Sequence, residues 1–327
     1  MRPVLLSNLF ALLALTALQA GADPLSLDVV RNNPVIDRLI PQDAVFEKVA
    51  DGFQFIEGPV WRGSQAEGHL LFSDIPANRV YRWDPRTDEV TVEIEPIHDP
   101  DIVTGAQGGS NGLLEDSSGR LVLFEHGMRR VARVGGDGVR RSIADRYQGA
   151  RLNSPNDGVF HSSGALFFTD PPYGFVLGDG DRNKEVKQNG IYRLDADGSV
   201  NLVGQMHRPN GIGLSPDEKS LYVASSDMEQ KFWMRFSVRD DLSLSAGDVF
   251  FDARDIKDAG EPDGFAVDRA GNIWASGPGG LVVISPDGVH LGTVRTPEQP
   301  ANATFDANEQ HIFLTARTGL YRLRLHD

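Results

Sequence analysis

Residues 208–217, Arg-Pro-Asn-Gly-Ile-Gly-Leu-Ser-Pro-Asp, join an Asn-Gly pair to a short apolar run and a Ser-Pro-Asp turn. Similar motifs, each an oxygen-bearing side chain beside Gly, Pro or Ala, recur about every 50 residues. The other five are Glu57-Gly58-Pro59, Asn111-Gly112-Leu113, Asn156-Asp157-Gly158, Asp263-Gly264-Phe265 and Asn302-Ala303-Thr304. Repeats of this length are typical of propellers and arrays, in which equivalent positions of successive units converge.

Each motif opens a unit of short strands separated by dense turn signals. A strand such as residues 121–124 follows the first turn, and a third strand such as residues 79–83 carries aromatic and arginine side chains. This pattern predicts an all-β fold, a six-bladed β-propeller with about four strands in each blade. The last unit ends near Leu325, too early for its own outer strand. We therefore expect a strand within residues 44–55 to complete the last blade and close the propeller domain, residues 45–327.

Composition limits the classes of partner. The 327 residues carry a formal net charge of -14, which disfavours nucleic acid and anionic membranes because both require clustered Lys and Arg. Hydrophobic residues make up 40% of the chain, enough for a large core. There is no cysteine, which excludes thiol catalysis. Oligomeric state is open between a monomer and a small homo-oligomer.

The first 22 residues have the pattern of a secretory signal peptide. Arg2 precedes a mostly apolar run at residues 4–18, and Ala20-Gly21-Ala22 is a small-residue cleavage site. An uncleaved anchor is the alternative. We expect a periplasmic or secreted protein, with no membrane contact beyond export, in which residues 23–44 form a mobile or surface-packed lead-in.

Several of these motifs together resemble those of a known family. Residues 57–61 (Glu-Gly-Pro-Val-Trp), 208–211 (Arg-Pro-Asn-Gly) and 262–264 (Pro-Asp-Gly) carry the resemblance, in this order along the chain. They are similar to the gluconolactonase, senescence-marker and luciferin-regenerating-enzyme family over about residues 45–325. The resemblance implies a six-bladed propeller with one divalent cation in its central tunnel, commonly calcium or zinc. It also implies hydrolysis of lactones or esters.

The resemblance also assigns site residues. The family's metal ligands fall on Glu57, Asn210 and Asp263, and Asn156 falls at a position near both metal and substrate. The segment Glu125–Val131 and Pro171-Pro-Tyr-Gly174 look like the bacterial gluconolactonase branch. Asn302 stands where the other motifs have a glycine-containing pair, so no ligand role is assigned to it.

The chemistry of these side chains agrees with a hard cation. Two carboxylates and amide oxygens form an oxygen-only ligand set, which Ca2+ accepts with six to eight ligands. Zn2+ usually takes His or Cys ligands and Mg2+ demands stricter geometry, so Ca2+ leads, with Zn2+, Mg2+ or Mn2+ as alternatives. Without a cation, Glu57 and Asp263 would repel each other, so we expect a metal-stabilised fold.

Lactone hydrolysis requires water to add to an ester carbonyl, with a base to remove the proton of the water. Asp263 is the first candidate for the base, and His126 is the rival acid or base because histidine titrates near neutrality. The side chains predicted to hold the sugar hydroxyls or the carbonyl of a small lactone are Asn111, Asn156, Arg151 and Tyr173.

Two other functions stay open from the sequence. The same site suits a metal-dependent esterase, an organophosphate hydrolase or an aromatic-lactone hydrolase. A non-enzymatic calcium-binding propeller is the second alternative, because propellers host unrelated functions. The sequence alone therefore favours a sugar lactonase without fixing its substrate.

Overall fold

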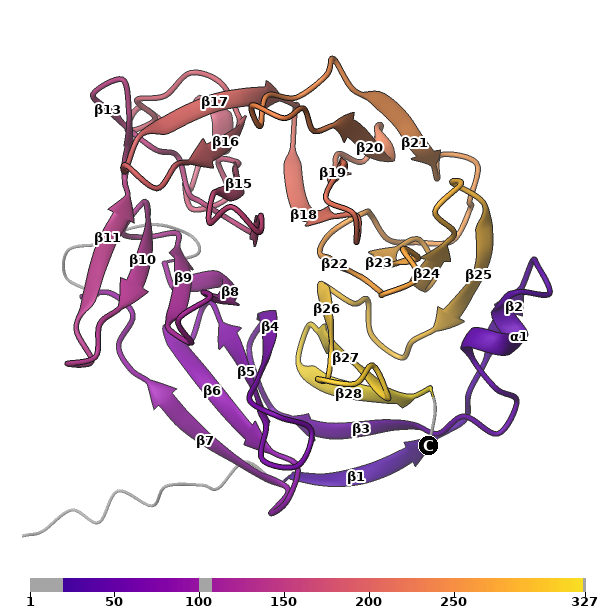
Figure 1. Ribbon diagram of the computed structural model, residues 1–327. Helices are drawn as coiled ribbons and strands as arrows, with labels where there is room; N and C mark the ends of the chain where they lie inside the picture. The colour runs from indigo at the N-terminus through magenta and orange to yellow at the C-terminus, as the bar shows by residue number, and fades with distance from the viewer. Residues whose placement is uncertain (1–19, 100–107, 326–327) are drawn as a thin grey trace, which may run out of the picture.

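Six antiparallel sheets surround a common centre in the computed structural model, which describes residues 20–99 and 108–325 (Figure 1). The predicted signal peptide therefore lies almost wholly outside the described residues, as do residues 100–107. The only helices in the described part are α1 (Ile36–Leu39) and a 3-10 turn at Gly178–Gly180. None of them has the length and apolar character needed to span a membrane. The predicted all-β, six-bladed architecture is confirmed.

Blades one to four follow the order of the chain. The first contains β4 (Ile56–Arg62), β5 (His69–Asp74), β6 (Arg79–Asp84) and β7 (Glu89–Ile94). The second contains β8 (Ser110–Glu115), β9 (Leu121–Glu125), β10 (Arg130–Val134) and β11 (Arg140–Ala144). The third contains β14 (Gly158–Phe160), β15 (Leu166–Asp170), β16 (Gly190–Leu194) and β17 (Val200–Gln205). The fourth contains β18 (Pro209–Leu214), β19 (Ser220–Ser226), β20 (Lys231–Ser237) and β21 (Asp248–Asp252).

The last two blades include strands from the N-terminal segment. The fifth contains β22 (Phe265–Val267), β23 (Ile273–Gly277), β24 (Gly280–Ile284) and β25 (His290–Arg295), with β2 (Val29–Arg31) outside β25. The sixth contains β26 (Asn302–Phe305), β27 (His311–Ala316), β28 (Gly319–Arg324), β3 (Phe46–Asp51) and β1 (Ala20–Leu25). A small hairpin of β12 (Arg146–Tyr147) and β13 (Ala150–Arg151) links blades two and three.

The lead-in packs against the propeller. β3 pairs antiparallel with β28, so the sixth sheet contains strands from both ends of the described chain. Ile36 and Ile40, in and after α1, are fully buried in an apolar cluster shared with blades five and six. β1 crosses the predicted cleavage site after Ala22, and Asp23 and Leu25 beyond that site still pair with β3. Removal of residues 1–22 therefore leaves part of this outer strand in place.

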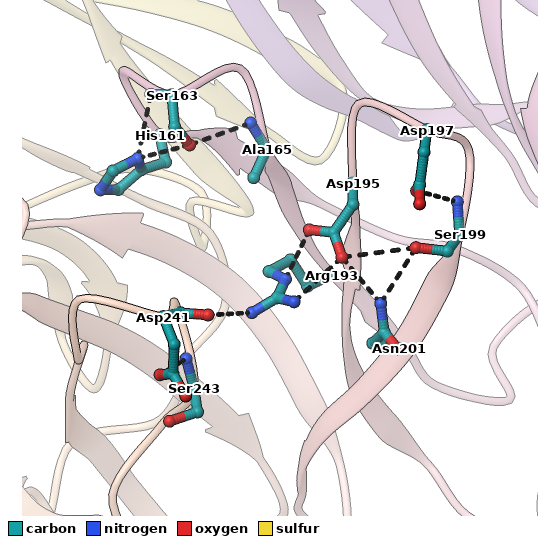
Figure 2. Close-up of polar contacts among 10 residues, drawn as sticks. All are labelled: His161, Ser163, Ala165, Arg193, Asp195, Asp197, Ser199, Asn201, Asp241 and Ser243. Atoms are coloured by element: carbon teal, nitrogen blue, oxygen red, sulfur yellow. Dashed lines mark hydrogen bonds and ion pairs between the residues drawn. The ribbon is translucent and has the colours of Figure 1, made fainter.

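Neighbouring blades are joined by apolar packing and by polar contacts at their edges. Trp61 of blade one stacks on Phe313 of blade six, with ring centroids 5.6 Å apart. In blade three, Arg193 donates to both carboxylate oxygens of Asp195 at 2.7 and 2.9 Å. Its third nitrogen reaches the carbonyl of Asp241 in blade four at 3.0 Å, as Figure 2 shows. Such contacts hold the blades in fixed positions, and these positions orient the inner strands.

Candidate functional site

The polar-Gly motifs lie at the inner strands of the blades, which face the centre in Figure 1. In β4, the pairing with β5 shifts register between Glu57 and Val60. β8 and β18 shift in the same way immediately around Asn111 and Asn210. A bulge of this kind changes the direction of a side chain within a strand. In three of the six blades the motif is therefore a bulge that presents an oxygen-bearing side chain.

Glycine follows the polar residue because the inner strands approach one another closely. A Cβ atom on Gly58 would lie 2.1 Å from the backbone oxygen of Asn111 in the next blade. A Cβ atom on Gly211 would lie 2.5 Å from the backbone oxygen of Asp263. Both distances are far below van der Waals contact, so neither position accepts another residue without movement of the backbone. This packing confirms that equivalent motif positions converge.

Four amide and imidazole side chains form one hydrogen-bonded chain. Asn111 Nδ2 donates to Asn156 Oδ1 at 2.8 Å, and Asn156 Nδ2 donates to Asn210 Oδ1 at 2.7 Å. Asn210 Nδ2 in turn donates to Ser226 Oγ at 2.8 Å. His126 Nε2 lies 3.1 Å from Asn156 Oδ1, so the proton on Nε2 points at this oxygen. The structure therefore brings together Asn111, Asn156, Asn210 and His126.

A group of carboxyl side chains lies beside this amide chain. Asn302 Nδ2 donates to Glu57 Oε2 at 3.0 Å and is 3.4 Å from Asp157 Oδ2. Burial raises the pKa of Glu57 to about 7. Burial, followed by the charge of Glu57, raises the pKa of Asp157 to about 8. Burial and then the charges of Glu57 and Asp157 raise the pKa of Asp263 well above its usual value. These groups are therefore close enough to disfavour simultaneous ionisation.

Two predicted residues, Tyr173 and the Asn111 of the amide chain, carry buried polar atoms without a well-aligned hydrogen bond. The buried Tyr173 hydroxyl makes no well-aligned hydrogen bond among the described residues, although the side chains of Ser226 and Asn210 lie close to it. Burial and then the charge of Asp263 raise its pKa. The side-chain oxygen of Asn111 is also buried and unpaired within that part of the chain. Burial lowers the pKa of His126 to about 4, which leaves its imidazole neutral at pH 7. Buried polar atoms without partners are costly, so these atoms mark places where a ligand would bind.

The donor set fits a divalent cation by its chemistry. Within residues 20–99 and 108–325, no group of three or more His, Asp or Glu side chains is arranged to hold a metal ion. A cation here would therefore take amide as well as carboxylate oxygens, which suits Ca2+. No Lys or Arg pairs with Glu57, Asp157 or Asp263 in the described chain, so positive charge from a cation would relieve their repulsion.

Other candidates lie outside the cluster. Arg151 Nη2 donates to the carbonyl of Met128 at 2.8 Å, and no described hydrogen bond joins its side chain to the amide chain. Its role in substrate binding stays a prediction. Residues 108–112 match the Gly-x-Ser-x-Gly pattern of serine hydrolases, but Ser110 is fully buried in β8 and bonds the hydroxyl of Ser73 at 2.8 Å. A serine nucleophile requires an exposed turn next to a base, so this serine is structural.

Sequence reasoning missed two residues of the cluster. The sequence places Asp157 in a recurring motif but assigns a role only to its neighbour Asn156, whereas the structure buries the Asp157 carboxyl group beside Glu57. Asn302 was given no ligand role, and the structure uses its amide to bridge Glu57 and Asp157. The signal for Asp157 was its place in a motif that carries two oxygen-bearing residues in succession, either of which can face the centre.

A cavity of about 310 Å³ opens beside Asp263. Its walls come from the loops before β4, β22 and β26 and from the β27–β28 turn, which are far apart in sequence. The lining residues are Phe55, Ala259, Gly260, Glu261, Asp263, Gln299, Pro300, Ala301 and Arg317. A space of this size admits a small molecule and places it directly against a predicted catalytic carboxylate.

Comparison with known proteins agrees with this geometry. The gluconolactonase of Zymomonas mobilis is 36% identical over 307 residues, 90% of this chain and 85% of its own length. The pentonolactonase XacC of Haloferax volcanii is 30% identical over 251 residues, 74% of each chain. The solved structure of a gluconolactonase from Xanthomonas campestris matches with a TM-score of 0.80 and 34% identity, covering 94% of this chain and 98% of that one. The model of the SMP-30/Gluconolactonase/LRE-like region matches residues 55–318, so the chain belongs to this family.

Proposed function

We propose that this protein is a hydrolase that opens a sugar lactone to the aldonic acid, with a divalent cation bound at the amide–carboxylate cluster. The observation that carries the proposal is the convergence of Glu57, Asn210 and Asp263, with Asp263 forming a wall of the 310 Å³ cavity. Relatives that are a gluconolactonase and a pentonolactonase support the substrate class. The finer assignments of metal and of individual roles rest on the chemistry of the side chains.

The reaction adds water to the lactone carbonyl and breaks the ring C–O bond. Asp263 accepts a proton from the attacking water, and a proton passes to the ring oxygen as the alkoxide leaves. A bound divalent cation would polarise the carbonyl and offset the negative charge that develops on its oxygen. Asp263 accepts a proton only as the carboxylate, and a cation nearby would favour this form by lowering the pKa that burial raises.

Ca2+ is the cation that the side chains fit best. Glu57 and Asp263 would contribute carboxylates, and Asn156 and Asn210 would contribute amide oxygens in exchange for hydrogen bonds that these oxygens now accept. This set contains oxygen only, which Ca2+ prefers, whereas Zn2+ favours nitrogen or sulfur ligands. Mg2+, Mn2+ and Zn2+ are the alternatives for direct comparison.

The remaining polar groups would hold the substrate. The unpaired hydroxyl of Tyr173 is available to donate to a substrate oxygen, and the unpaired oxygen of Asn111 is available to accept from a sugar hydroxyl. His126 donates to Asn156 Oδ1. This hydrogen bond fixes the orientation of the Asn156 amide, which lies between Asn111 and Asn210 in the amide chain. In this account, His126 positions Asn156, while its direct action as an acid or base is the alternative.

Export forms a second part of the proposal. The pattern of residues 1–22 supports a cleaved signal peptide and a periplasmic or secreted protein. A lactonase at that location would act on lactones released by extracytoplasmic oxidation of sugars. Cell fractionation with an antibody against the propeller tests this: recovery in the cytoplasm of full-length protein would refute it.

A substrate panel tests the proposed activity. D-glucono-δ-lactone and a pentonolactone, followed by release of acid in a pH-stat, are expected to be hydrolysed well above the rate in buffer. An organophosphate and an aryl ester are expected to react slowly. Faster turnover of either of these would move the assignment to the alternative hydrolases on the same site, and a folded, cation-binding protein that hydrolyses none would indicate a binding role.

A further inference from the structure

The cavity beside Asp263 has an uneven chemical lining. Phe55, Pro300 and Ala301 present apolar surface, while Glu261 and Arg317 bring opposite charges. The Gln299 amide nitrogen donates to the carbonyl of Gly277 at 3.0 Å and lies 3.4 Å from both the Ser276 hydroxyl and the Pro300 carbonyl. The cavity therefore combines apolar side chains with two charged groups, a lining that suits a carbon chain bearing hydroxyl groups.

Arg317 has no side-chain partner among the described residues. It lies at the tip of the β27–β28 turn with φ 47°, and its side chain is exposed. Only its backbone is held, through the bond from the Ile56 amide to its carbonyl at 2.8 Å. Most arginines near a carboxylate in this protein form ion pairs, as Arg193 does with Asp195 at 2.7 Å. The guanidinium of Arg317 is therefore available to a ligand in the cavity.

Glu261 is the complementary group. Its carboxylate makes no hydrogen bond or ion pair in the described chain, and its charge acts on Asp263. Arg317 and Glu261 do not pair with each other. Arg317 supplies hydrogen-bond donors and Glu261 supplies acceptors. Because their charges cancel, the pair suits an uncharged ligand better than an anionic one.

We infer that this cavity is the specificity pocket for the hydroxyl-bearing end of the lactone. The scissile carbonyl lies at Asp263, Arg317 donates to and Glu261 accepts from the exocyclic hydroxyls, and the C–H face of the chain packs on Phe55. The inference rests on the proposed lactonase activity and adds to it the preferred class, neutral polyhydroxylated lactones over unsubstituted ones. Arg317 and Glu261 act here in recognition, away from the bonds that change.

The test compares two lactones of the same ring size. D-glucono-δ-lactone carries hydroxyl groups and δ-valerolactone carries none, so the ratio of their kcat/KM values isolates hydroxyl recognition. Arg317→Asn suits the turn because asparagine tolerates a positive φ. We expect this variant to lower kcat/KM for the sugar lactone by about 10- to 100-fold, mainly through KM, as loss of a charged hydrogen bond predicts. Turnover of δ-valerolactone is expected to change by no more than about twofold.

Further variants separate recognition from structure. Arg317→Lys keeps a cationic donor and is expected to recover most of the selectivity. Glu261→Ala should reduce it, and Glu261→Gln, which keeps an acceptor oxygen, should reduce it less. Arg38→Asn is the matched control, because Arg38 is exposed on α1 and does not line the cavity.

The outcomes are distinct. An equal loss for both lactones, or no loss for either, would overturn the inference while leaving the lactonase activity in place. If the unaltered protein hydrolyses δ-valerolactone as efficiently as the sugar lactone, the specificity pocket is also refuted. Failure of the unaltered protein to hydrolyse any lactone would instead refute the proposed function, and the pocket assignment with it.

Discussion

Replacement of Asp263 with asparagine is expected to lower kcat for lactone hydrolysis by about 100- to 10,000-fold, the usual contribution of a general base. Asparagine keeps an oxygen for a cation but cannot accept the proton of the attacking water. The same change removes one of the buried carboxylates that raise one another's pKa. The chelated variant is therefore expected to melt at a higher temperature than the chelated parent at pH 8. A pH-stat assay and a thermal melt measure the two effects.

The comparison with His126 identifies the base. His126→Gln keeps a donor to Asn156, so a positioning role predicts a fall in kcat of only about 10-fold. The opposite pattern would identify His126 as the base. In that case His126→Gln would lose about 100- to 10,000-fold in kcat, and Asp263→Asn would stay active. A measured rise in the melting temperature of the Asp263 variant would exclude a simple loss of folding as the cause of its lower activity.

The chelated protein is expected to lose stability as pH rises. In the folded state the pKa of Glu57 is about 7 and that of Asp157 about 8, against usual values of 4.5 and 3.8. The unfolded chain therefore releases these protons first, and its ionisation draws the equilibrium toward unfolding. The loss of stability begins near pH 4, grows through pH 7 and levels off above about pH 8. Below pH 4 both states hold the protons and these groups contribute no pH dependence.

Thermal melts in chelator at several pH values measure this effect. Between pH 5 and pH 8 we expect the melting temperature to fall by roughly 5–10 °C, as a loss of a few kcal/mol predicts for a domain of this size. Saturating Ca2+ is expected to remove most of the fall, since a bound cation stabilises the ionised carboxylates. A melting temperature that rises with pH in chelator, or that is unchanged by addition of Ca2+, would mean that the carboxyl groups are not the cation site.

The propeller was predictable because its signal is repeated and physically forced. Gly58 and Gly211 occupy points where the backbone of the next blade leaves no room for a Cβ atom. Glycine is therefore required at these equivalent positions, and the repeat is visible in the sequence. The polar residues beside these glycines lie at bulges that present their side chains, and the convergence of these positions follows from the repeat. Where backbone packing requires glycine in successive blades, glycine recurs in the sequence at a nearly constant spacing.

The rest of the site depends on contacts that leave no such trace. In the Asn156-Asp157 pair, the sequence does not show which side chain faces the centre, and the structure buries both. Asn302 lacks the glycine that follows the polar residue in the other motifs, so the sequence assigns it no ligand role. In the structure its amide bridges two carboxyl groups. Glu261 and Arg317 come from loops with no repeat, and only the fold brings them to one cavity.

The most direct test of this account is hydrolysis of D-glucono-δ-lactone by chelated protein, before and after each cation is added. Thermal melts on the same samples report whether the protein stays folded. The account predicts little activity in chelator, recovery with Ca2+, and no recovery when Glu57→Gln and Asp263→Asn are combined. Full activity in folded protein from which the cation has been removed would contradict it.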